Sequence, residues 1–387
     1  MSNYDGFSLN RPIGIVFAAA VLVMACLSVF PASHTRPTSI FAIQTNEFWL
    51  NQGNFLYVLE QSEGRPSASQ QQSVSPRLFT FETDEFWLNL HHFLYVLGRA
   101  EAKMPDAGET SVAGAPREAE RGLQGLTREE QTTWAAAVSA YASGLSLKSN
   151  LDAAMTTVTR ALVGISDRPN LAGTSLDPAV AAVLERAAPI YRKAWWTEHR
   201  AANRKWRSSA ENLVNRYGGG TIEFVSRAYG ATWPLSGYPA HICSYANFGG
   251  AYSIGGANFV IVASMTDQND GLHGLEILVH EGMHQWDGQI FAALASQART
   301  LNVVIPRDLT HAMIFFTAGE AVRRIDSTYV PVADAFAVWP KQLSGASLPA
   351  LRLKPALEEV WKPYLNGSGT GDEALAALVA RAAAVSR

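Results

Sequence analysis

The sequence predicts an α+β fold that is mostly helical, with a small mixed β-sheet ahead of one central helix. Three observations support this prediction. Helix-compatible sequence dominates from residue 127 to residue 217. Segments rich in β-branched and aromatic residues, bounded by glycines, follow between residues 221 and 264. A helical apolar pattern then begins around Leu275, and helices fill the remainder of the chain.

Length and composition indicate a well-packed globular body. The chain has 387 residues, of which 48% are hydrophobic, so it can bury one large core or two smaller ones. The formal net charge is −3, with no basic stripe, and we expect no nucleic-acid partner. The two cysteines, Cys26 and Cys243, are too few for a disulfide framework.

The N-terminal segment carries an uncharged apolar run, "IGIVFAAAVLVMACLSVF", at residues 13–30. Its length lies between that of a signal-peptide core and a minimal membrane span. Residues 1–33 are therefore expected to be a signal peptide or a membrane anchor, and the remainder to be periplasmic or secreted. The sequence Val-Met-Ala-Cys ending at Cys26 loosely resembles a lipoprotein cleavage site, where that cysteine would carry the lipid.

An internal repeat follows this segment. The sequence "TNEFWLNQGNFLYVL" at 45–59 returns as "TDEFWLNLHHFLYVL" at 83–97, with eleven of fifteen positions identical. The second copy predicts a core helix, whereas the first carries a mid-helix glycine that costs about 1 kcal/mol. We therefore expect residues 34–77 to be a duplicated segment with a flexible linker. His91 and His92 are expected on an exposed polar face.

The region 78–218 is predicted to be mostly helical. Thr127 and Glu130 form a capping box, which satisfies free backbone donors at a helix start. Asp177 and Pro178 give an N-cap followed by proline at the first helical position. Three successive glycines at the end of this region predict a helix stop.

The region 219–387 is expected to hold the chemistry. It begins with three predicted strands, at 221–230, 241–248 and 255–264, and continues with helices. The sequence "VHEGMHQWDG" at 279–288 lies on the first of these helices.

This motif predicts a metal site. His280 and His284 lie one turn apart on one helix face and can offer two nitrogens to one metal. Glu281 is rotated away, where it can act on a zinc-bound water as that water attacks a carbonyl. The opposing face carries an apolar stripe that we expect to be buried. Its members are Leu275, Val279, Met283, Trp286 and Ile290.

A third ligand is expected on the downstream helix at 307–324, which contains both Glu320 and His311. These two residues are nine positions apart, about half a turn out of phase, so both cannot point straight at one metal. Glu320 is the first choice, because a buried glutamate in apolar surroundings is costly without a cation. His311 is the alternative, as a ligand or as a hydrogen-bond donor to the oxyanion. Asp287 can orient a ligand imidazole.

The other histidines are expected outside the site. His241 lies on a predicted strand and should pack in the core, and His199 should be a surface or core-lining residue. His273 is nearly two turns before His280, which is too far to share its metal.

The motif HExxH followed by a distal glutamate in a Gly-Glu pair on a later helix resembles the gluzincins. The resemblance covers about residues 255–325 and extends to uncharacterised exported bacterial gluzincin-like proteins. It implies a zincin-like fold, Zn²⁺ held by His280, His284 and Glu320, and Glu281 as catalytic base. It also implies that the strand before the motif is an edge strand that pairs with extended substrate. The asparagine that precedes the third-ligand glutamate in thermolysin-like members is absent here.

The expected function is that of an exported zinc-dependent hydrolase, most specifically a metallopeptidase acting on a peptide or protein substrate. The alternative is an exported binding or assembly protein with a zincin-like scaffold and an inactive or structural metal site. The intact Glu281 favours the hydrolase, because a structural metal site needs no base.

Overall fold

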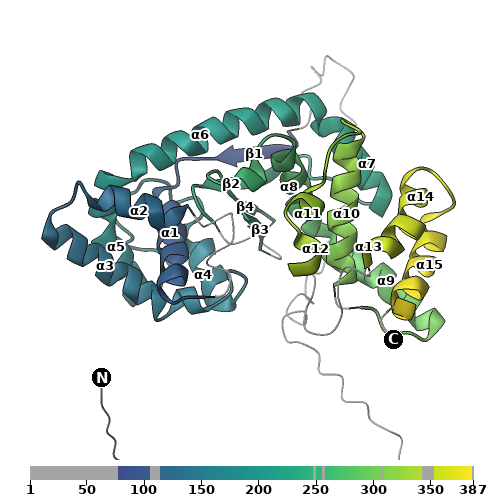
Figure 1. Cartoon of the computed structure of the whole chain (residues 1–387), viewed down its shortest axis with the longest axis horizontal. Helices are drawn as coiled ribbons and strands as arrows, with labels where there is room; N and C mark the ends of the chain where they lie inside the picture. Colours follow the sequence, from purple (N-terminus) through teal and green to yellow (C-terminus); the bar gives the residue numbers. More distant parts are fainter. Residues whose placement is uncertain are drawn as a thin grey trace, which may run out of the picture. The chain divides into compact units, whose positions relative to one another are not determined.

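The computed structural model shows helices packed around a small four-stranded sheet (Figure 1). The structure describes residues 77–104, 114–246, 250–254, 258–306, 308–341 and 353–385. The first repeat copy and the apolar N-terminal segment lie outside these residues. Among the described helices, none combines the length and the apolar character needed to cross a membrane.

The sheet has the strand order β1-β2-β4-β3, from Phe79–Glu82, Tyr238–Cys243, Val260–Ala263 and Ala251–Ser253 respectively. The first three strands are parallel, and β3 runs antiparallel to β4 at one edge. The prediction that the strand before the motif is an edge strand is therefore wrong. Every residue of β4 is buried, and a strand that is apolar on both faces belongs inside a sheet.

The sheet separates two hydrophobic cores, because successive residues of a strand point to opposite faces. Val260 and Val262 of β4 belong to one core, which they share with helices of the C-terminal half. Ile261 and Ala263 belong to the other, which is built mainly from the first five helices. The metal-motif helix lies in the first of these cores.

The first five helices carry the predicted helix starts. Glu130 N donates to Thr127 Oγ1 at 3.3 Å and Thr127 N donates to Glu130 Oε2 at 2.7 Å, which confirms the capping box. Asp177 Oδ1 accepts from Ala179 N at 2.8 Å, which confirms the second N-cap. The helices are α1 (Phe86–Glu101), α2 (Ala115–Leu123), α3 (Arg128–Ala142), α4 (Ala153–Leu162) and α5 (Pro178–Ala194), with a 3-10 turn at Leu145–Leu147.

Helix α1, the second repeat copy, is buried on every side from Phe86 to Gly98. The expectation that His91 and His92 lie on an exposed face is wrong. His91 Nδ1 hydrogen-bonds with the Tyr141 hydroxyl at 2.9 Å, and His92 Nε2 with a strand β3 tyrosine hydroxyl at 3.2 Å. Since α1 packs against α3, α5 and the sheet, it has no face left for solvent.

The segment expected as the first strand is a helix. Helix α6 (Trp196–Leu213) passes through a π-helical turn (Val214–Gly218) directly into α7 (Gly219–Tyr229). The strand prediction rested on β-branched composition, but Ile222, Val225 and other buried residues share one helical face. The glycines do not stop the helix. A Cβ at Gly218 would lie 2.7 Å from Leu78 Cδ1, so this glycine permits a close approach.

The chain after β4 is helical, and its first two longer helices, with the short turn between them, bury the predicted apolar stripe. The helix expected to carry the whole stripe ends at Met283. The α+β class is confirmed, with a mostly helical chain and a small mixed sheet. The helices are α8 (Leu272–Met283), α9 (Asp287–Leu301), α10 (Leu309–Arg323), α11 (Val332–Ala335), α12 (Val338–Lys341), α13 (Leu353–Ala356), α14 (Lys362–Leu365) and α15 (Gly371–Val385). Short turns lie at Asp267–Asn269, His284–Trp286 and Leu357–Trp361.

Candidate metal centre

The candidate site lies where α8 and α10 pack together. The ring centroids of His280 and Phe315 are 3.8 Å apart, and those of His284 and His311 are 5.2 Å apart. His284 follows His280 by one turn, whereas its partner His311 precedes Phe315 by one turn. The two helices therefore run antiparallel, and the end of α8 meets the start of α10.

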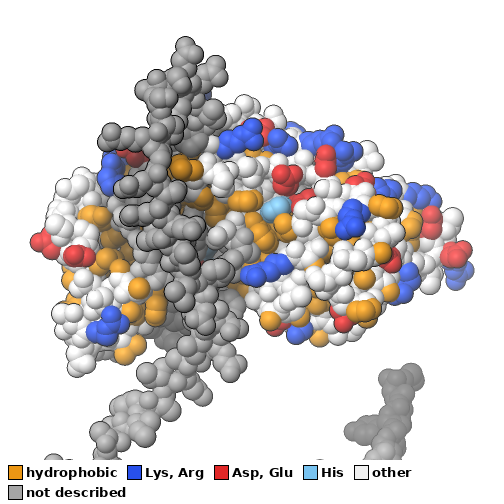
Figure 2. Space-filling model, turned by 180° about the vertical axis from the view of Figure 1, so that it is seen from behind, with side chains coloured by type: hydrophobic (Ala, Val, Ile, Leu, Met, Phe, Trp, Pro, Cys, Tyr) orange, Lys and Arg blue, Asp and Glu red, His pale blue; other side chains and the backbone are white. Residues whose placement is uncertain are grey.

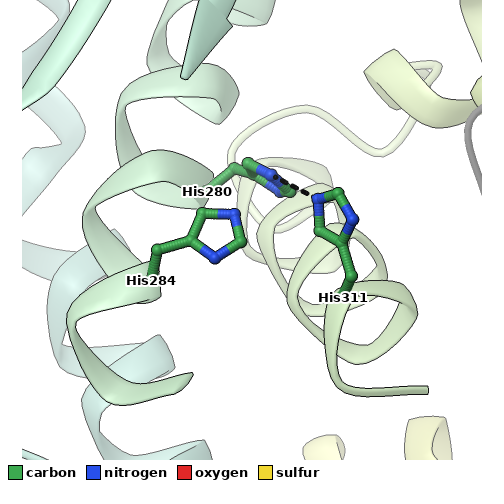
Figure 3. A group of neighbouring side chains, drawn as sticks. All are labelled: His280, His284 and His311. Carbon is green, nitrogen blue, oxygen red and sulfur yellow. Dashed lines mark hydrogen bonds between the residues drawn. The ribbon is translucent and has the colours of Figure 1, made fainter. Parts of the chain in front are cut away.

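This arrangement brings three histidines together (Figure 3). One nitrogen from each of His280, His284 and His311 lies within 4.8 Å of the other two. His280 Nε2 and His311 Nε2 are 3.3 Å apart. In the described part of the chain, this is the one group of three His, Cys, Asp or Glu side chains with such spacing.

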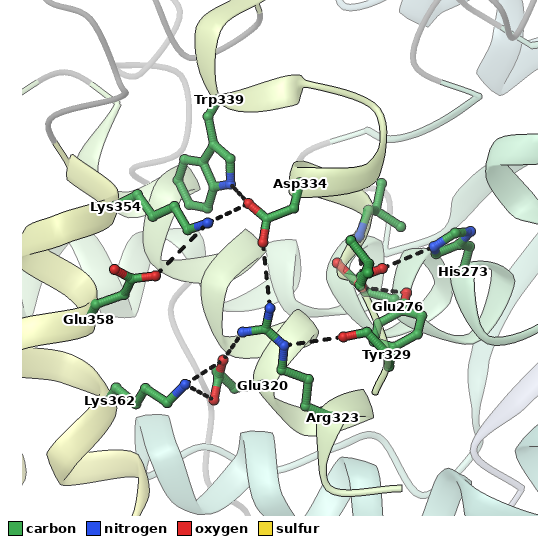
Figure 4. A network of polar contacts seen from close by, with 12 residues as sticks. His273, Glu276, Glu320, Arg323, Tyr329, Asp334, Trp339, Lys354, Glu358 and Lys362 are labelled. Atoms are coloured by element: carbon green, nitrogen blue, oxygen red, sulfur yellow. Dashed lines mark hydrogen bonds and ion pairs between the residues drawn. The ribbon is translucent and has the colours of Figure 1, made fainter. Parts of the chain in front are cut away.

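Glu320, the expected third ligand, does not join this cluster. It follows His311 by nine residues, about two and a half turns, so it points from the opposite side of α10. Its carboxylate pairs with Arg323 at 2.6 Å and with Lys362 at 3.2 Å (Figure 4). The cation that offsets the burial of Glu320 is thus supplied by the chain itself. The structure places His311, the alternative, beside the histidine pair.

The environment keeps two of the imidazoles neutral. Burial lowers the pKa of His280 well below its ordinary value, and the neighbouring imidazoles lower it further. Burial also lowers the pKa of His311 to about 3. Neutral imidazole is the form that binds a metal, because the ligating nitrogen then carries a free lone pair.

His284 differs because Asp287 lies beside it. Burial alone would lower the pKa of His284, but the Asp287 carboxylate outweighs burial and raises this pKa to about 9. Asp287 Oδ2 lies 3.0 Å from His284 Nδ1, which leaves Nε2 of that ring for the cluster. A carboxylate on the far nitrogen fixes the tautomer and orientation of a metal-binding histidine. The orienting role predicted for Asp287 therefore has the geometry that it needs.

Glu281 lies between the cluster and the sheet. Its side chain is buried, and burial raises the pKa of its carboxyl. Its Oε1 is 4.0 Å from His280 Nε2, whereas Oε2 accepts a hydrogen bond from Ser253 Oγ at 2.8 Å. Sequence analysis missed Ser253, because no local pattern links a three-residue strand to a helix 28 positions later.

A close contact at Gly282 positions the motif helix. A Cβ at this residue would lie 2.2 Å from Trp233 Cη2, so the indole packs directly on the α8 backbone. Trp233 is held in turn by a 2.8 Å hydrogen bond from its Nε1 to the Leu78 carbonyl and by contact with Trp286. The glycine inside the motif thus serves helix packing.

A second buried carboxylate, Glu276, ties α8 to the segment after α10 (Figure 4). It accepts hydrogen bonds from the Tyr329 hydroxyl at 2.6 Å and from Val332 N at 3.1 Å. Burial raises the pKa of Glu276 to about 7. Because Glu276 is one turn before His280, these bonds anchor the helix that carries His280 and Glu281.

The remaining histidines of the described residues lie outside the cluster. His199 Nε2 pairs with Glu118 at 2.7 Å and His241 Nδ1 pairs with Glu85 at 2.7 Å, both in the interior. His273 Nε2 donates to a backbone carbonyl in the segment after α10. On the face of the molecule drawn in Figure 2, one histidine side chain is visible at the surface, bordered by hydrophobic side chains and close to acidic ones.

The cluster fits a zinc ion. Two nitrogens each about 2.0–2.1 Å from a tetrahedral zinc are about 3.3 Å apart, which is the separation found between His280 and His311. The other features of a zinc site are two neutral imidazoles, the Asp287 carboxylate behind the His284 ring and the buried Glu281 carboxyl beside the cluster. Such an arrangement can hold a cation and move a proton next to it. No family model, curated protein or solved structure matches this chain.

Proposed function

We propose that this chain is a zinc-dependent hydrolase, most specifically a metallopeptidase with a gluzincin-like arrangement of its helices. His280, His284 and His311 hold the metal, and Glu281 is the catalytic base. His311 takes the place of the glutamate found in the gluzincins. The observation that carries the proposal is the convergence of three imidazole nitrogens within 4.8 Å, with the Glu281 carboxylate beside them.

The chemistry follows from these residues. A zinc ion supplies a Lewis acid that polarises a carbonyl and makes water more acidic. Glu281 accepts the proton from the attacking water and delivers it to the leaving nitrogen. In the metal-free protein, burial raises the pKa of this carboxyl, which makes it a stronger base than an exposed glutamate.

An extended peptide is the substrate class that the sheet favours. Strand β3 is the edge strand of the described sheet beyond β4, and it lies next to Glu281. A peptide that adds to the edge of a sheet binds as an extended chain. The apolar residues 13–30 support an extracytoplasmic place for this activity.

The number of ligands distinguishes this proposal from the alternative of a binding protein with a structural zinc. Structural zinc sites have four protein ligands, whereas catalytic sites have three and an open position. Three ligands converge in the described part of the chain. The acidic group at Glu281 is a further feature that a structural site does not need.

Zinc analysis of a matched pair of variants tests the ligand set. We expect the full-length chain to bind about one zinc. His311→Ala should weaken zinc affinity at least about a hundredfold, because one of three ligands is lost. Glu320→Gln, on the opposite face of the same helix, should keep its zinc and lose about 1 kcal/mol of stability from its partly exposed ion pairs. Zinc loss in Glu320→Gln with retention in His311→Ala would reverse the assignment.

Glu281→Gln tests the activity, because glutamine keeps the size of the side chain but cannot accept a proton. Zinc should remain bound, while hydrolysis of a peptide panel falls by about 10²–10⁴-fold. A zinc-loaded wild-type protein that cleaves no peptide, ester or other amide would instead favour the binding protein.

A further inference from the structure

Strand β3 presents neighbouring side chains to the two cores. Tyr252 points into the core of the first five helices, where its hydroxyl hydrogen-bonds with Thr159 and His92, each at 3.2 Å. Ser253 points the other way, toward α8. The backbone of Ser253 is held in addition by its pairing with Val260 of β4. The serine is therefore fixed by both the sheet and the helical core.

The Ser253 hydroxyl meets two acceptors of the same residue. Its Oγ lies 2.7 Å from the Glu281 backbone carbonyl and 2.8 Å from Glu281 Oε2. The hydroxyl carries one hydrogen, so it donates to one of these two oxygens at a time. The carboxylate oxygen is the stronger acceptor of the two, because it carries charge when Glu281 is ionised. Donation to Oε2 then constrains the carboxylate, and the nearby carbonyl keeps the hydroxyl beside the α8 backbone.

The two oxygens of Glu281 are thereby made different. Oε2 is held by Ser253, while Oε1 lies 4.0 Å from His280 Nε2, on the side of the histidine cluster. Ser253 is the only side chain in the described residues that hydrogen-bonds to this carboxylate. The backbone of Ser253 also hydrogen-bonds to this carboxylate, so the hydroxyl adds a second point of attachment to the one that the backbone gives.

We infer that Ser253 is the positioning residue of the reaction, which holds Oε2 of Glu281 so that Oε1 faces the metal cluster. The inference rests on the proposed function of Glu281 as the base. It goes further because it states that a residue of edge strand β3 influences the rate of the catalytic step. A displacement of about 1 Å in a reacting group can lower a rate about a hundredfold, so the hydroxyl acts on turnover and leaves substrate affinity unchanged.

The test compares Ser253→Ala with Ser253→Thr in the zinc-loaded full-length chain. Ser264→Ala is the matched control, because it removes a hydroxyl bonded to Asn203, away from Glu281. For a peptide that the wild type cleaves, Ser253→Ala should lower kcat about ten- to a hundredfold with KM within about twofold and zinc content unchanged. Ser253→Thr should restore kcat to within about threefold, and Ser264→Ala should keep the wild-type kcat. A purely structural role would not give this rescue or this separation of kcat from KM.

Crystal structures of the zinc-loaded wild type and Ser253→Ala decide the inference independently of turnover. We expect the Glu281 carboxylate to leave its wild-type position in Ser253→Ala. An unmoved carboxylate, an unchanged kcat, or a kcat that Ser253→Thr does not restore would overturn the inference. A wild type that binds zinc but cleaves nothing would overturn the proposed hydrolysis, and with it the role in turnover. The crystal structures would then still show whether Ser253 orients the side chain.

Discussion

The glycine within the motif at residues 279–288, Gly282, gives a prediction whose size follows from the structure. In Gly282→Ala, the added Cβ would lie 2.2 Å from Trp233 Cη2 and 2.9 Å from Cζ2, whereas ordinary contact begins at 3.4 Å. The indole or the helix must therefore move by more than 1 Å. The indole is held by its hydrogen bond to the Leu78 carbonyl and by T-shaped contacts with the rings of Phe79 and Trp286.

Three contributions decide the sign. Overpacking costs about 1–3 kcal/mol, and weakening the Trp233 hydrogen bond costs about 1 kcal/mol. The helix preference of alanine over glycine returns about 1 kcal/mol. We expect Gly282→Ala to lower the free energy of unfolding by about 1–3 kcal/mol, which calorimetry would record as a Tm lowered by roughly 2–4 °C per kcal/mol.

Gly220→Ala is the matched control, because this helical glycine has nothing within 4 Å of the position of a Cβ. It should be neutral or stabilising by up to about 1 kcal/mol. If Gly282→Ala were as stable as Gly220→Ala, the close approach of Trp233 to α8 would be refuted.

Two further predictions concern pH. Burial lowers the pKa of His92 to about 3, below its unfolded value near 6.5, so the unfolded chain binds more protons and stability should fall as the pH drops from about 6.5 toward 3. His92→Gln should flatten this fall in urea unfolding at pH 7.5 and 5.5, and an NMR titration of His92 near pH 6.5 would contradict the reasoning. In the metal-free protein, Asp287 raises the pKa of His284 to about 9, so the charged pair stabilises the fold fully below pH 6.5 and loses this effect as the pH rises through 9. Zinc must displace that proton. Calorimetry of zinc binding in two buffers at pH 7.5 should show the release of about one proton. The affinity for zinc should rise toward pH 9, and Asp287→Asn should reduce the proton release.

The sequence predicted those parts of the site that depend on local spacing. His280, Glu281 and His284 lie on one short helical stretch, so their relation is set by helix geometry alone. The burial of the apolar stripe and the capping box at Thr127 are local in the same sense, and both are confirmed.

The choice between Glu320 and His311 could not be made from spacing. Their opposite phase was evident, but the face of α10 that meets α8 is set by contacts distant in sequence. Gly319 is one of them, because a Cβ there would lie 2.7 Å from Pro331 Cβ. Burial of Glu320 does call for a cation, but Arg323 and Lys362, which lies on a later helix, supply it.

Two other predictions, the strand at 221–230 and the exposure of His91 and His92, are wrong. Both depended on residue composition, whereas the outcome depends on which parts of the chain pack against these segments. The segment that forms α7 is rich in β-branched residues, yet its buried positions follow a helical period. His91 and His92 are polar, but α1 is enclosed on all sides, and each imidazole found a tyrosine hydroxyl as partner. Neither partner is near in sequence.

The pairing of β1 with β2 has a consequence for biosynthesis. Phe79 pairs with Tyr238, which is 159 residues later (238 − 79). At about 5–20 residues per second, a ribosome needs roughly 8–30 s to make the intervening chain. During that interval β1, with its two phenylalanines, has no partner strand, and its backbone groups are unpaired. A strand in this state is prone to pair with the wrong segment or with another chain. The half of the chain that carries the histidine cluster therefore cannot complete its sheet until more than half of the message is translated. A chaperone that shields Phe79–Glu82 would raise the yield of folded protein.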